Sequence, residues 1–127
     1  MNYAAFAAIG IGAMLGAWLR WGTSLALNHI VPSLPLGTLA VNLTGGFLIG
    51  AALEFFVQHS ALSPEYRLFF VTGFLGSLTT FSAFSLEAVI LLQEARYGWA
   101  MLLIGSHLIG SLAMTLLGFY VMRAISA

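Results

Sequence analysis

The chain has 127 residues, of which 61% are hydrophobic and only 6% are charged, whereas an ordinary soluble domain is about a quarter charged. The formal net charge is zero at pH 7 and there is no cysteine, which argues against nucleic-acid binding, disulfides and thiolate metal sites. This composition indicates an all-α integral membrane protein.

Four transmembrane helices are expected, forming a single transmembrane domain over residues 1–127. Crossing the hydrocarbon takes about 20 apolar residues, so the length allows roughly four crossings joined by short loops. The spans are expected at residues 3–27, 36–57, 68–92 and 99–123, separated by polar or proline-containing segments.

The second expected span contains a lone amide side chain, Asn42, with Thr38 one turn earlier on the same face. A polar group in hydrocarbon needs a partner, so such a residue either joins helices or lines a polar path. Both interpretations are open from the sequence.

The third expected span is interrupted by the segment Gly73–Ser85, GFLGSLTTFSAFS, which is rich in glycine and hydroxyl groups. Two glycines followed by Thr79–Thr80 weaken a helix, and irregular backbone at membrane depth is tolerated where it is buried or lines a cavity. Freed carbonyls suit a hard cation, whereas hydroxyls such as Ser82 suit an anion. Phe81 and Phe84 are either core packing or a source of electropositive ring edges for a small anion.

The fourth expected span has three polar residues at a spacing of four, His107, Ser111 and Thr115. This spacing puts them on one face of a helix and favours a polar lining. The alternative is that the hydroxyls bond back to their own helix carbonyls and that the histidine is packed in the core.

The charged residues bear on orientation and on transport type. Arg20 and Arg96 fall on one side of the expected topology, and Arg67 and Arg123 fall on the other. Because Lys/Arg bias in short loops sets orientation, this balance predicts either a weakly biased protein or both orientations paired as a dual-topology antiparallel homodimer. The four acids are expected near helix ends or in a loop, which favours a passive pore over a proton-coupled transporter.

Three segments together resemble the Fluc/CrcB family of bacterial fluoride channels. Gly37–Gly50 fits the family pattern GTLxVNxxGxFxxG, and Gly73–Ser85 fits GFxGxxTTFSTF, with Ala83 in place of Thr. Gly12–Trp21 fits GGxxGAxxRY with two substitutions. The three segments are spread over most of the chain.

The resemblance implies a non-enzymatic, fluoride-selective channel in the bacterial inner membrane that exports cytoplasmic fluoride passively and gives fluoride resistance. It implies an antiparallel homodimer with two pathways and a structural sodium ion at its centre, bound by the backbone carbonyls of Gly76 and Thr79. The expected fluoride pathway consists of Phe81, Phe84, Asn42, Thr80, Ser82, His107, Ser111 and Thr115.

Two other functions fit the size and the balanced arginines. One is a small dual-topology proton-coupled multidrug exporter, for which Glu87 is the only acidic residue in the third span. The other is a non-transporting assembly subunit, in which the polar residues would join helices.

Overall fold

The structure, a computed structural model, describes residues 2–127, and that part of the chain is helical and contains no strand. By length and composition, four helices are apolar enough to cross a membrane, counting the segments of residues 64–93 as one. The expected all-α architecture with four spans and a break in the third is therefore confirmed.

Three crossings are single helices, and the third is divided into four segments. The single helices are α1 (Tyr3–Leu27), α2 (Leu36–Gln58) and α6 (Tyr97–Ser126). The third crossing consists of α3 (Pro64–Arg67), the π-helical segment η1 (Leu68–Leu75), α4 (Gly76–Leu78) and α5 (Phe81–Gln93).

Some helix ends lie beyond the expected spans. The third crossing begins at Pro64, four residues before the expected start, because proline has a helical φ and its missing N–H is not needed in the first turn. The fourth crossing is Tyr97–Ser126 instead of 99–123. The turn before it is tight because Ala95 adopts a left-handed φ of 57°.

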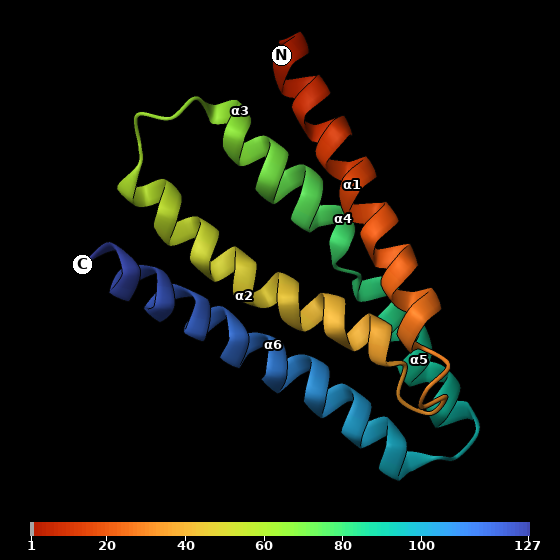
Figure 1. Cartoon of the computed structure of the whole chain (residues 1–127). Coiled ribbons are helices and arrows are strands. Elements are labelled where there is room, and N and C mark those ends of the chain that lie inside the picture. The colour runs from red at the N-terminus through yellow and green to blue at the C-terminus, as the bar shows by residue number, and fades with distance from the viewer. Residues whose placement is uncertain (1) are drawn as a thin grey trace.

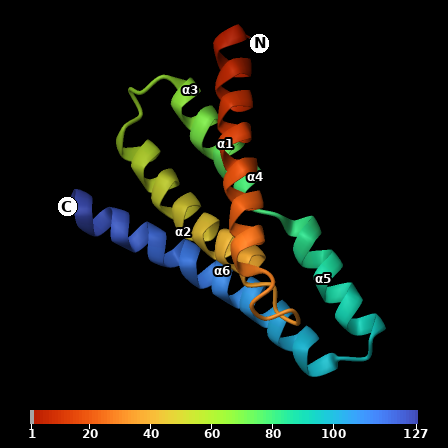
Figure 2. The ribbon, with the colours of Figure 1, turned by 45° about the vertical axis from the view of Figure 1, so that its right-hand side comes forward.

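The helices pack as two pairs that meet along the bundle. α2 lies beside α6, and α1 lies beside η1 and α4 (Figure 1). Both termini and the loop of residues 59–63 are at one end of the bundle, and the loops of residues 28–35 and 94–96 are at the other (Figure 1). Seen from the side, the chain leaves α4 as a short extended link before α5 begins (Figure 2).

Glycines let the paired backbones approach closely. A Cβ on Gly12 or Gly16 of α1 would collide with backbone carbonyls of η1, and one on Gly50 or Gly118 would collide with carbonyls across the α2–α6 contact. Small residues at such contacts are a common basis of helix association in membranes, where lipid removes the hydrophobic drive between helices.

Replacing Gly16 by alanine is expected to destabilise the fold. The new Cβ would collide with the Phe74 carbonyl, and overpacking of this kind costs about 1–3 kcal/mol. Circular dichroism of the detergent-solubilised protein should show a lower unfolding temperature. Gly98→Ala is the matched control, because nothing lies within 4 Å of its added Cβ. Equal unfolding temperatures for the two variants would contradict this account of the α1–η1 contact.

Candidate functional site

The break in the third crossing is an extended link at Thr79 and Thr80. Their backbone angles are φ −86°, ψ 153° and φ −147°, ψ 108°, both in the extended region that β-branched residues favour. The Thr80 hydroxyl accepts a hydrogen bond from the Ala83 amide at 3.1 Å and so caps the start of α5. The same threonine pair thus ends one helix and starts the next.

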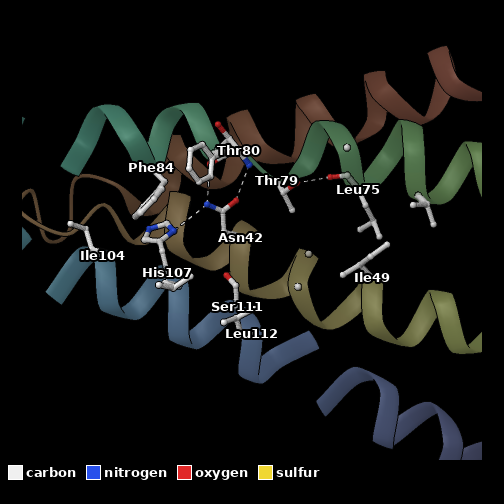
Figure 3. Close-up of a pocket in the computed structure, with 16 residues that line it drawn as sticks. Asn42, Ile49, Leu75, Thr79, Thr80, Phe84, Ile104, His107, Ser111 and Leu112 are labelled. Carbon is white, nitrogen blue, oxygen red and sulfur yellow. Dashed lines mark hydrogen bonds between the residues drawn. The ribbon is translucent and has the colours of Figure 1, made fainter. Parts of the chain in front are cut away.

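Asn42 of α2 holds this link in place (Figure 3). Its Oδ1 accepts from the Thr80 amide at 2.8 Å, and its Nδ2 donates to the Thr80 carbonyl at 3.1 Å. Nδ2 also lies 3.1 Å from Nδ1 of His107 on α6. Asn42 therefore joins α2, the helix break and α6.

The break changes the hydrogen bonds of two backbone carbonyls, those of Gly76 and Thr79. In a continuous helix the Thr80 amide would donate to Gly76 and the Ala83 amide to Thr79. Here the first donates to Asn42 and the second to the Thr80 hydroxyl. Both carbonyls are thereby deprived of their helical donors.

A cavity of about 560 Å³ lies beside the break, between α2, the third crossing and α6 (Figure 3). Eight of the ten residues expected at functional sites line it: Asn42, Gly76, Thr79, Thr80, Phe81, Phe84, His107 and Ser111. The rest of its wall is glycine and aliphatic side chains, including Ile49, Leu75 and Leu112. The wall thus combines neutral polar groups with apolar surface.

The two phenyl rings differ in their surroundings. Their centroids are 5.5 Å apart with the rings inclined at 63°, an edge-on arrangement. Phe81 is 79% exposed, whereas Phe84 packs against a buried cluster and lies 4.8 Å from the His107 ring. Phe84 is therefore partly core packing, whereas the Phe81 ring touches Phe84 but is mostly exposed in a single chain.

Two of the ten expected residues, Ser82 and Thr115, do not line the cavity. Ser82 is exposed, with its hydroxyl 3.3 Å from that of Thr80. The Thr115 hydroxyl donates to the Ser111 carbonyl one turn earlier, at 3.0 Å. Thr115 thus makes the back-bond that was the alternative to a polar lining.

Arg20 makes a contact that the sequence did not reveal. Its Nε donates to the Ser77 carbonyl at 2.8 Å. The cation therefore sits at the carbonyl end of the interrupted helix, where a positive charge is favourable. The only feature of the sequence that pointed to this contact was an arginine within two turns of the end of a span.

A second unanticipated cluster surrounds Thr38, which is buried. The Thr38 hydroxyl donates to Glu87 at 2.7 Å, and its amide donates to Asn28 Oδ1 at 3.1 Å. The other Glu87 oxygen is buried and unpaired. In the sequence, Thr38 was expected only as an extension of the polar face that contains Asn42. Its partners Asn28 and Glu87 lie 10 and 49 residues away along the chain and were not expected beside it.

Over residues 2–127, no group of three or more histidine, aspartate or glutamate side chains is placed to hold a metal ion. The oxygen atoms at the break are backbone carbonyls, the threonine hydroxyls and the side-chain oxygen of Asn42, which already accepts from the Thr80 amide. Such oxygens suit a hard cation.

Comparison with known proteins gives consistent matches over nearly the whole chain. A model of the family described as CrcB-like protein, Camphor Resistance (CrcB), matches residues 7–119. The "Fluoride-specific ion channel FluC" of Nitrosospira multiformis is 58% identical over 123 residues, which cover 97% of this chain and 96% of the relative. A protein of the same name from Acinetobacter baumannii is 60% identical, over 87% of this chain and 86% of the relative. Another from Cupriavidus pinatubonensis is 55% identical, over 95% of this chain and 96% of the relative.

Proposed function

Because this chain belongs to the CrcB-like protein family, we propose that it is a fluoride-selective ion channel that lets fluoride leave the bacterial cytoplasm passively. It is a multi-pass membrane protein and a transporter, not an enzyme, and its four spans are consistent with the inner membrane. The relatives are named for fluoride conduction. The observation that most supports the proposal is that the Phe81–Phe84 pair, Asn42 and the helix break meet at one cavity.

The chemistry of the cavity suits passage of a small anion. Hydrogen fluoride crosses membranes as a neutral molecule and dissociates inside the cell, so the trapped fluoride must leave as the anion. The lining offers hydroxyl groups and ring edges, and it includes no lysine or arginine. A pore without fixed positive charge attracts an anion without holding it too tightly for release.

The open side of the cavity supports pairing with a second copy, and the balanced arginines favour the opposite orientation for that copy. Phe81, Leu108 and Leu112 line the cavity and are 79%, 57% and 65% exposed. In a single chain the cavity's polar groups would open toward lipid, which is costly. A second copy in the opposite orientation would cover this face and close two pathways.

The same proposal includes a structural sodium ion at the dimer contact. Gly76 is exposed on the broken crossing, and the carbonyls of Gly76 and Thr79 lack their helical donors. Two such carbonyls from each copy would provide four oxygen ligands. A bound sodium would satisfy these carbonyls and join the copies, while the moving ion is handled by side chains.

An experimental structure of the dimer is expected to contain a spherical density near its axis with carbonyl oxygens of Gly76 and Thr79 as ligands. The oxygen distances should be shorter than the about 2.7 Å usual for a hydrogen bond from water. The density should persist in buffers without divalent metal. Ordinary hydrogen-bond distances, or carbonyls that turn away from the axis, would contradict the sodium site.

Fluoride efflux from liposomes tests the proposed function. Purified protein is reconstituted into liposomes loaded with potassium fluoride, and a fluoride electrode follows release after valinomycin is added. Rapid release is expected without any proton gradient, and protein-free liposomes are the control. Release that requires a proton gradient would favour the multidrug-exporter class, and no release would favour the assembly subunit.

A further inference from the structure

Arg20 is a charged side chain inside a membrane-spanning helix, about two turns before the end of α1. The residue is half-buried, and within residues 2–127 its guanidinium forms no ion pair with an acid. Its Nε donates instead to a backbone carbonyl, that of Ser77, at 2.8 Å. A cation at membrane depth is costly and commonly marks a functional site, so this contact needs an explanation.

The Ser77 carbonyl accepts this bond because the helix break has removed its usual donor. In a continuous helix, the Phe81 amide would donate to Ser77. Here α4 ends at Leu78, and Phe81 lies beyond the extended link as the first residue of α5. The Nε–H of Arg20 therefore takes the place of the Phe81 amide.

The break is thus held by side chains from two other crossings. Arg20 of α1 bonds to the backbone before the extended link, and Asn42 of α2 bonds to the backbone within it. The carbonyls released by the break are divided between two situations. That of Ser77 is turned toward α1 and is occupied by Arg20, whereas those of Gly76 and Thr79 lack their helical donors.

Without Arg20, the simplest donor for the Ser77 carbonyl is the Phe81 amide. Forming that bond would rejoin α4 and α5 as one helix. A rejoined helix would also return helical donors to the carbonyls of Gly76 and Thr79. Because a buried carbonyl without a donor is unfavourable, loss of Arg20 shifts the balance toward the continuous helix.

We propose that Arg20 is a positioning residue for the cation site: by bonding to Ser77 it keeps the third crossing broken and the carbonyls of Gly76 and Thr79 free to bind sodium. This inference rests on the proposed sodium site of the dimer and adds the residue that maintains it. The charge of Arg20 alone would repel sodium, whereas its hydrogen bond prepares the ligands of sodium. The two effects therefore have opposite signs.

The sodium dependence of dimer stability separates the two effects. A bound ion raises the unfolding temperature by mass action, so purified dimer in detergent is unfolded at increasing sodium chloride, with N-methylglucamine chloride keeping the ionic strength constant. Arg20→Met extends as far as Nε but has no donor. Its half-maximal sodium concentration should rise about tenfold or more, the effect of one lost charged hydrogen bond. Arg20→Lys keeps a charged donor and should stay near the value of the unsubstituted chain.

Arg67→Met is the matched control, because it also removes one arginine from the orientation balance but lies in α3, at the start of the third crossing. Its half-maximal sodium concentration should equal that of the unsubstituted chain. An unchanged value in Arg20→Met would overturn the inference. So would a lower value, which is what removal of a repelling charge alone predicts.

If Arg20→Met does not fold, Arg20→Lys decides. A retained sodium effect in that variant would support the inference, and loss of the effect while the variant stays folded would overturn it. Absence of any sodium effect in the unsubstituted chain would refute the proposed sodium site and this inference with it. Fluoride efflux from liposomes tests the channel function separately.

Discussion

Replacing Phe81 or Phe84 by isoleucine is expected to remove most fluoride transport while leaving the protein folded. Isoleucine is apolar and of similar bulk but lacks the electropositive ring edge that would face the anion. A swap of this kind usually costs less than about 1.5 kcal/mol of stability. Phe84→Ile should cost more stability than Phe81→Ile, because Phe84 packs against a buried cluster and Phe81 is exposed in the single chain.

Liposomal fluoride efflux and dimer retention on size exclusion, measured on the same preparations, check this expectation. Phe6→Ile serves as the control, since that ring is 71% exposed on α1 and does not line the cavity. Its efflux should be unchanged. If Phe81→Ile and Phe84→Ile both conduct as well as the control, the rings are packing elements, and the pathway must be sought along another wall of the cavity.

Forcing one orientation in the membrane is expected to abolish activity. Arg20 and Arg96 belong to the half of the bundle that ends in the loop of residues 28–35, and Arg67 and Arg123 to the opposite half. With His59→Lys and Ser60→Lys, two positively charged residues on one side of the membrane face four on the other. This bias should orient every copy alike. An antiparallel dimer then cannot form. Fluoride sensitivity of cells lacking their own exporter measures the loss.

Co-expression restores activity if pairing is the reason for the loss. A second chain with His29→Lys and Ile30→Lys has the opposite bias, and the two together should rescue the cells. The same positions changed to glutamate, His59→Glu and Ser60→Glu, are the matched control, because acidic residues contribute little to orientation. Full activity of the lysine variant expressed alone would rule out the antiparallel arrangement.

The four crossings and the break in the third could be predicted because they depend on local properties of the sequence. Apolar length specifies each span, and the Thr79–Thr80 pair after two glycines has the backbone preferences that the extended link requires. The π-helical form of Leu68–Leu75 was not predictable, since its sequence LFFVTGFL has no local signal for a widened helix. The π-helical segment η1 packs closely against α1, a contact between segments that are far apart in the sequence.

The site could be predicted only in part, because its geometry depends on contacts between distant residues. The spacing of His107 and Ser111 is enough to place both on one face, and both line the cavity. Spacing could not distinguish them from Thr115, whose hydroxyl bonds back to its own helix. The link from Asn42 to Thr80 spans 38 residues, and periodicity within one helix contains no information about it.

The reversal potential of the purified protein in a planar bilayer tests passive fluoride conduction most directly. Fluoride is held at unequal concentrations on the two sides, chloride is equal on both sides and in excess, and the pH is the same on both. A fluoride-selective channel predicts current that reverses at the fluoride equilibrium potential and that stays there when a pH gradient is imposed. Reversal at the chloride potential, or a reversal that moves with the pH gradient, would contradict the account.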